Sequence, residues 1–168
     1  SRVLLISLLF SLLSAQTVTA QPSRENSVKS IFKVSSELSG ACASALLITP
    51  RSILVAAHFS NAACKKGLCT GIELLDSRGE RVFFGSAKLE RRSELLDTAV
   101  LELERDLDPS WQSLKLPNAN SEPKTDLWLA GFPRCENFSQ FRASLKSFDG
   151  IEAIVSSIAA AGSSGSAL

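Results

Sequence analysis

Three short stretches of the sequence carry side chains that could act together in acyl transfer. The chain's only histidine, His58, follows the apolar run ILVAA, Asp97 opens the run DTAVLEL, and Ser164 lies in the glycine-flanked stretch AGSSGSAL. A serine hydroxyl is a weak nucleophile that needs a base within hydrogen-bond reach, and an imidazole titrates close to neutral pH. Taken singly, the same residues are typical of a core histidine, a turn acid and a flexible loop.

Taken together and in this order, the stretches resemble the motif blocks T-A-A-H-C, D-x-A-L-L-x-L and G-D-S-G-G-P of the chymotrypsin-like serine peptidases. The resemblance implies that His58 is the general base, that Asp97 is a buried carboxylate orienting it, and that Ser164 is the nucleophile. It also implies an oxyanion hole made by the backbone N–H groups of Gly162 and Ser164. The spacings, 97 − 58 = 39 and 164 − 97 = 67 residues, suit a base and an acid on one barrel and a nucleophile on a second.

Other hydrolase families match the sequence less well. The order His–Asp–Ser differs from the Asp–His–Ser order of subtilisins and from the Ser–Asp–His order of α/β-hydrolases. The nucleophile elbow Gly-x-Ser-x-Gly of the α/β-hydrolases also fails, because Ser166 occupies its last position. A lipase or an esterase is therefore disfavoured.

Two positions depart from the trypsin-type pattern. Ser163 stands where those enzymes have the Asp that pairs with a new Ile-Val-Gly-Gly terminus, and no such terminus occurs in this chain. We therefore expect another activation route, or none beyond signal removal. In this respect the chain resembles the bacterial glutamyl-endopeptidase-like and periplasmic housekeeping members. Ile158, six residues before Ser164, matches the floor of the substrate pocket and disfavours Lys or Arg substrates.

The four cysteines leave several disulfide pairings open. Phe59 replaces the cysteine that follows the catalytic histidine in the family, whereas Cys42 stands at the expected place before it. The resemblance implies that the bond has moved to Cys42–Cys64, with Cys42–Cys69 and then Cys64–Cys69 as alternatives. Cys135 resembles a second-barrel cysteine whose partner would lie beyond the end of the sequence, so we expect it to be unpaired.

The hydrophobic pattern predicts an all-β chain. Apolar or alternating runs indicate strands over residues 28–34, 42–49, 53–57, 71–75, 81–89 and 98–103, with a hairpin turn at DSRGE, residues 76–80. Six strands can close a small barrel, which we place at residues 21–104. A polar, proline-containing linker follows at 105–125. Strands over 126–132, 138–148 and 151–158 then begin a second barrel, truncated at 126–168, so that the complete fold would be two six-stranded antiparallel β-barrels.

The first twenty residues are typical of a signal peptide. Arg2 precedes an apolar stretch over residues 3–13, and small residues lead up to a cleavage site after Ala20. We therefore expect a secreted or periplasmic protein with no membrane span after cleavage, in which disulfides can form. The chain contains no Met, and we expect the sequence to be incomplete at both its beginning and its end.

The charge balance narrows the range of partners. Lys and Arg number 18 against 17 Asp and Glu, which provides no basic field for nucleic acid or an anionic membrane. The pairs Lys65-Lys66 and Arg91-Arg92 are interpreted as solvated loop or edge-strand charges. No cofactor or metal motif is visible. The leading hypothesis is a monomeric serine endopeptidase acting on proteins or peptides, and the alternative is a non-catalytic or inactive binding module on the same fold.

Overall fold

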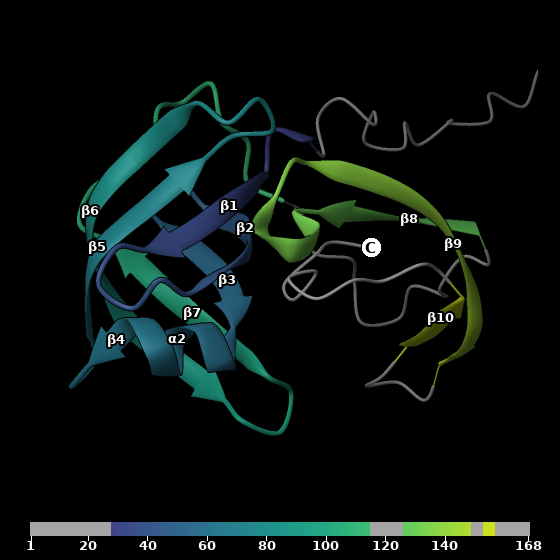
Figure 1. The fold of residues 1–168 in the computed structure, drawn as a ribbon, viewed down its shortest axis with the longest axis horizontal. Helices are drawn as coiled ribbons and strands as arrows, with labels where there is room; N and C mark the ends of the chain where they lie inside the picture. Colours follow the sequence, from purple (N-terminus) through teal and green to yellow (C-terminus); the bar gives the residue numbers. More distant parts are fainter. Residues whose placement is uncertain (1–27, 115–125, 149–152, 157–168) are drawn as a thin grey trace, which may run out of the picture.

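The computed structural model describes residues 28–114, 126–148 and 153–156, whose regular elements are almost all β-strands (Figure 1). No helix among these residues is long and apolar enough to cross a membrane. The helical elements are α2 (Ala57–Ala63) and the 3-10 turn η1 (Pro133–Cys135). The strands are β1 (Ile31–Ser36), β2 (Cys42–Thr49), β3 (Ser52–Ala56), β4 (Cys64–Lys65), β5 (Leu68–Leu75), β6 (Arg81–Ser93), β7 (Thr98–Leu103), β8 (Asp126–Gly131), β9 (Ser139–Phe148) and β10 (Ala153–Ser156).

Six antiparallel strands close into a barrel in the order β1-β2-β3-β7-β6-β5, and β5 returns to pair with β1. Val34 of β1 stands opposite Leu74 of β5 at this closure. A closed barrel leaves no long unpaired edge among its strands. The predicted six-stranded barrel is confirmed, and the predicted strands 42–49 and 98–103 agree with β2 and β7 residue for residue.

Alternating side chains fill the interior of the barrel. In β7 every second residue is buried, and the same alternation puts Phe32 and Val34 of β1 inside. This is the pattern expected of strands with one face on a core and one face toward solvent or a neighbouring unit. The largest fully buried side chains come from all the long barrel strands and from α2, namely Phe32, Phe59, Phe83, Leu47, Ile53, Ile72, Leu74, Leu101 and Leu103.

The helix α2 is an element that the sequence analysis did not predict. The predicted strand 53–57 ends one residue earlier, at Ala56, and the chain turns at once into a helix of seven residues, AHFSNAA. Alanine and phenylalanine side chains on its inner face are buried, including Ala57 and Phe59. A helix this short has little stability of its own, so its packing against the end of the barrel must hold it.

A second, three-stranded antiparallel sheet in the order β10-β9-β8 lies beside the barrel (Figure 1). A separate apolar cluster joins the two sheets. It contains Ile31 and Leu46 of the barrel, Ala130 of β8, and Phe132 in the loop directly after β8. The backbone N–H of Phe132 donates a 3.0 Å hydrogen bond to the hydroxyl of Ser44, which is fully buried. The rest of the predicted second barrel lies outside the described residues.

Part of the predicted linker packs closely on the barrel. Leu107 is buried, and its N–H donates to the carbonyl of Pro50 at 2.8 Å. Trp111 meets the ring of Phe32 edge-on, with 5.1 Å between the centroids. Leu114 continues this attachment by donating its N–H to the carbonyl of Leu47 at 2.7 Å. Residues 105–114 therefore extend the barrel core, and residues 115–125 lie outside the described part.

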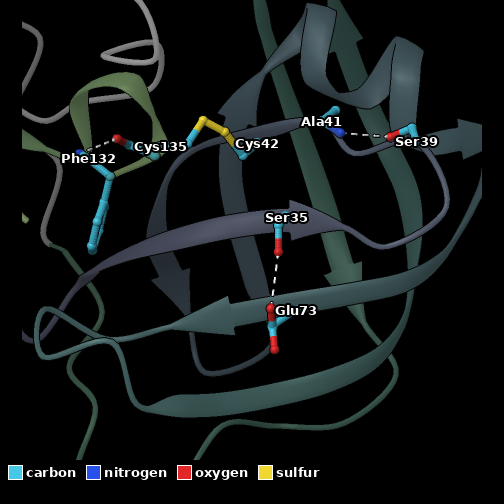
Figure 2. Close-up of a disulfide and its surroundings, with 8 residues drawn as sticks. Ser35, Ser39, Ala41, Cys42, Glu73, Phe132 and Cys135 are labelled. Carbon is cyan, nitrogen blue, oxygen red and sulfur yellow. Dashed lines mark hydrogen bonds between the residues drawn. A yellow bond between two sulfur atoms is a disulfide. The ribbon is translucent and has the colours of Figure 1, made fainter. Parts of the chain in front are cut away.

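The disulfides pair Cys42 with Cys135 and Cys64 with Cys69, so the predicted bonds from Cys42 to Cys64 or Cys69 are wrong. Cys64 and Cys69 are direct partners in the β4–β5 ladder, so their side chains lie on the same face of adjacent strands and can join. Cys135, expected to be unpaired, lies in η1 beside the start of β2 (Figure 2). The bond to Cys42 therefore ties the second sheet to the barrel.

Removing the two disulfides should have unequal effects on stability. The Cys42–Cys135 bond closes a loop of 93 residues, whereas the Cys64–Cys69 bond closes one of 5. Loop-closure entropy then predicts that the variant with both Cys42→Ser and Cys135→Ser loses about 4–5 kcal/mol, against about 2 kcal/mol for Cys64→Ser with Cys69→Ser. Urea unfolding followed by tryptophan fluorescence measures both losses. Equal losses would contradict the inter-sheet tether.

The hairpin between β5 and β6 is organised by a buried carboxylate. The Asp76 side chain is 3% exposed, and one of its oxygens accepts the N–H groups of Arg78 and Glu80, both at 2.9 Å. Its other oxygen accepts the Arg78 guanidinium at 3.1–3.2 Å. Gly79 takes the predicted left-handed conformation, with φ at 82°. Burial by itself raises the pKa of Asp76, but these hydrogen bonds and the Arg78 charge outweigh it and lower that pKa below its ordinary value of 3.8.

Asp76→Asn should therefore destabilise the barrel in a pH-dependent way. The folded-state pKa of Asp76 is lower than the unfolded one, so its contribution is complete above pH 3.8 and declines as the pH falls below that value. We expect the variant to lose about 1–3 kcal/mol at pH 7, where a charged hydrogen-bond acceptor is lost. The difference from the parent protein should shrink at pH 3. Asp106→Asn, at an exposed position, serves as the control in the same urea titrations.

Candidate active site

The pairing of β3 with β7 brings His58 and Asp97 together. Ala56, the last residue of β3, stands opposite Thr98, the first residue of β7. Asp97 immediately precedes Thr98, and α2, which carries His58, begins immediately after Ala56. Two residues that are 39 positions apart in the sequence must therefore meet at one end of the barrel, because the register of this strand pair puts their neighbours side by side.

Both carboxylate oxygens of Asp97 bind His58. Oδ2 lies 2.7 Å from Nδ1 of the imidazole, and Oδ1 accepts the backbone N–H of His58 at 3.0 Å. The N–H of Ala57 donates to the backbone carbonyl of Asp97, also at 3.0 Å. An ionised carboxylate can only accept hydrogen bonds, so the neutral imidazole must carry its proton on Nδ1. Its lone pair is then on Nε2, the nitrogen that faces away from Asp97 and can receive a proton.

The backbone of Asp97 is in a left-handed conformation, with φ at 45°. Most residues with a Cβ atom avoid this region, but Asp and Asn adopt it more readily than others. The turn that contains it is closed by the N–H of Asp97, which donates to the carbonyl of Glu94 at 3.3 Å. An aspartate at position 97 thus suits the left-handed backbone and also provides the carboxylate that binds His58.

The pair is more exposed than the resemblance implies for a buried carboxylate. The side chains of His58 and Asp97 are 57% and 53% exposed, because they lie on the loop and the helix at the open end of the barrel. Partial burial raises the pKa of Asp97, but the hydrogen bonds from the His58 backbone and ring, the His58 charge and the Ala57 N–H prevail and lower it below 3.8. Asp97 is therefore ionised throughout the neutral range.

The remaining predicted site residues cannot be placed beside this pair. Ser164, Gly162 and Ile158 lie outside the described residues, so their roles as nucleophile, oxyanion donor and pocket floor stay predictions. Within the described part of the chain, no group of three or more His, Cys, Asp or Glu side chains could hold a metal ion.

A third side chain at the site, Arg92, was not predicted from the sequence. The predicted strand ended at residue 89, but β6 continues to Ser93, and Arg92 lies next to α2. Its guanidinium bonds Asn61, three residues after His58, and also Glu94. The polar sequence ERRS gives no alternation that could extend the strand, and the spacing of His58 and Asn61 acquires meaning only once α2 is known.

The tautomer of His58 provides a direct test of the pair. Because His58 is the only histidine, ¹⁵N labelling of histidine yields a single imidazole to observe. We expect neutral His58 to carry its proton on Nδ1. Asparagine suits the same left-handed backbone, but its amide can donate a hydrogen bond to Nδ1, so Asp97→Asn should abolish this preference. Asp106→Asn is the charge-matched control. An unchanged ¹⁵N spectrum in Asp97→Asn would contradict the observed pairing.

None of the protein-family models compared with this sequence matches it, and no curated protein sequence is significantly similar. Solved structures nevertheless share the fold. A serine endoprotease from Yersinia pestis superposes with a TM-score of 0.67 and 19% identity over 85% of this chain and 50% of its own. The HtrA-type protease AlgW with tripeptide gives 0.64 and 14% over 85% and 48%. The Rv3671c protease of M. tuberculosis, in an inactive form, gives 0.60 and 15% over 84% and 72%.

The sequence identities of 14–19% are too low to assign an activity to this chain. The matches nevertheless cover 84–85% of it, which is enough to identify its fold. The chain spans about half the length of the Yersinia endoprotease and of AlgW. All three neighbours are proteases, and the 84–85% of this chain that their structures match includes more residues than the closed barrel alone. The chain therefore has the fold of the chymotrypsin-like serine peptidases.

Proposed function

We propose that this protein is a secreted or periplasmic serine endopeptidase that hydrolyses peptide bonds through His58, Asp97 and Ser164. The observation that carries the proposal is the hydrogen bond of 2.7 Å between Asp97 and Nδ1 of His58, on a barrel of the serine peptidase fold. That bond makes Nε2 the basic nitrogen, as a serine hydroxyl requires of its general base.

In the proposed mechanism, Nε2 of His58 takes the proton of the Ser164 hydroxyl while the oxygen attacks the substrate carbonyl. The negative charge that develops on the carbonyl oxygen is held by the backbone N–H groups of Gly162 and Ser164. The imidazolium then gives its proton to the amide nitrogen as the C–N bond breaks. The amine leaves, and the acyl group stays on the Ser164 oxygen as an acyl-enzyme. Water, activated by the same imidazole, releases the acid product and restores Ser164. Asp97 stays ionised throughout and stabilises the imidazolium.

The substrate class and the location follow from the same proposal. Protein or peptide substrates are expected, with Ile158 at the pocket floor disfavouring a Lys or Arg side chain. The HtrA-type neighbours favour a bacterial housekeeping peptidase over a zymogen-activated one, and the glutamyl-endopeptidase-like subtype stays a prediction. Two disulfides among the described residues are compatible with an oxidising compartment, in agreement with the proposed signal peptide.

A fluorophosphonate probe tests the nucleophile directly. We expect labelling of the folded protein at Ser164, loss of labelling in Ser164→Ala and His58→Ala, and unchanged labelling in the nearby control Ser166→Ala. Peptide mapping by mass spectrometry locates the labelled residue. Absence of label on a folded protein with His58 and Asp97 still hydrogen-bonded would instead favour the non-catalytic binding module.

Turnover of a casein-derived peptide mixture tests the role of Asp97. Asp97→Asn should lower kcat by about 10⁴-fold, since the imidazole then lacks the partner that fixes its tautomer. KM should change little, because Asp97 contacts His58 and lies on the side of the imidazole away from Nε2. A loss of less than about tenfold would show that Asp97 does not act through the imidazole.

A further inference from the structure

The two segments that hold His58 and Asp97 are both weakly anchored on their outer sides. Helix α2 has seven residues, no side-chain N-cap, and no charged residue in its end turns. The loop from Glu94 to Asp97 exposes its apolar side chains, with Leu95 89% and Leu96 51% accessible. Neither segment is therefore fixed by burial of its outer face, although the imidazole and the carboxylate need a constant separation to stay hydrogen-bonded.

One side chain contacts both segments. Arg92 Nη1 donates to Oδ1 of Asn61 at 2.5 Å, and Arg92 Nε lies 2.9 Å from Oε1 of Glu94. Asn61 is three residues after His58, which puts the two side chains on the same face of α2. Glu94 is the residue whose carbonyl accepts the N–H of Asp97. Arg92 is therefore linked to the segment of His58 through Asn61 and to the segment of Asp97 through Glu94.

The position of Arg92 in the sheet explains how it reaches both segments. Arg92 stands opposite Ala99 of β7, whose side chain is buried, whereas its neighbour Arg91 stands opposite Val100. Side chains of paired strand residues share a face, and successive residues alternate. Arg92 therefore emerges on the side of β6 that meets α2, and Arg91 emerges on the other side.

We propose that Arg92 is a positioning residue that sets the distance between His58 and Asp97 by clamping α2 to the loop before β7. The planar guanidinium has donors on more than one edge and can hold two acceptors in a fixed relative geometry, which the single ammonium of lysine cannot. The side chains of Arg92 and Glu94 are 40% and 64% exposed, and exposed ion pairs contribute little to global stability. We therefore expect Arg92 to affect the geometry of the His58–Asp97 pair. Only the consequence of this positioning for catalysis rests on the proposed function.

The test uses the tautomer ratio of neutral His58 in the full chain labelled with ¹⁵N-histidine. Arg92→Ala should lower the ratio of the Nδ1–H form to the Nε2–H form roughly two- to fivefold, the range to which exposed ion-pair couplings convert. Arg91→Ala removes the same charge from the adjacent position and should leave the ratio unchanged. Arg92→Lys should resemble Arg92→Ala, because the two-acceptor geometry is lost.

Variants that remove only one of the two contacts of Arg92 provide a second test if Arg92→Ala does not fold. Asn61→Ala removes the acceptor on α2 and Glu94→Gln weakens the acceptor on the loop, and each should lower the ratio by part of the full effect. A ratio in Arg92→Ala equal to that in the parent protein and in Arg91→Ala would overturn the clamp, as would full retention in Arg92→Lys.

Peptide turnover separates this proposal from the proposed function. If the chain is a peptidase, Arg92→Ala should lower kcat by the same two- to fivefold with KM unchanged, whereas a purely structural role would leave kcat per folded molecule intact. If the parent protein has no turnover at all, the proposed function fails, and the tautomer ratio alone still decides whether Arg92 positions His58 against Asp97.

Discussion

The register of β3 against β7 is the constraint on which the site depends. With Ala56 opposite Thr98, the residues that leave β3 and enter β7 must be neighbours, and these are His58 and Asp97. A shift of one residue would move every side chain of the strand to the other face. Such a shift would expose Val55 and Leu101, which fill the core, so hydrophobic burial protects the register and, through it, the pair.

The pair itself is held by backbone geometry more than by burial. His58 and Asp97 are both about half exposed, so water screens their mutual attraction. Three features orient the carboxylate: the left-handed backbone of Asp97, the N–H of Ala57 on its backbone carbonyl, and the N–H of His58 on Oδ1. The lowered pKa of Asp97 is a consequence of that arrangement, since the same N–H and imidazole donors favour the ionised form.

The connection between the two sheets combines a small apolar cluster with a covalent bond. Phe132 packs with Ile31 and Leu46, and its N–H bonds the buried Ser44 hydroxyl, while Cys135 three residues later is joined to Cys42 (Figure 2). Both attachments lie on β2 or its neighbour β1, the strands that lead into β3. The relative position of the two sheets is therefore fixed by both apolar packing and a covalent bond.

Local features of the sequence determined several strands, one hairpin turn and the types of the candidate site residues. The apolar run in residues 42–49 and the alternation in residues 98–103 were sufficient to bound two strands. The Asp-Ser-Arg-Gly run was sufficient to identify a hairpin turn with Gly79 at positive φ, because these patterns depend only on near neighbours. The types and order of His58, Asp97 and Ser164 were likewise sufficient to suggest acyl-transfer chemistry and a family resemblance. None of this requires knowing which distant residues touch.

The tertiary structure alone decided the pairings between distant residues. Cys42 bonds Cys135, 93 residues away, because strand pairing holds Cys64 against Cys69. The sequence offered Cys64–Cys69 as one alternative, but no local pattern indicated that Cys135 is the partner of Cys42. The helix at His58 forms because the end of the barrel buries its inner face, and Arg92 acquires partners only where β6, α2 and the loop before Asp97 converge. Contacts of this kind depend on strand register and closure, which are properties of the whole barrel and not of any short segment of it.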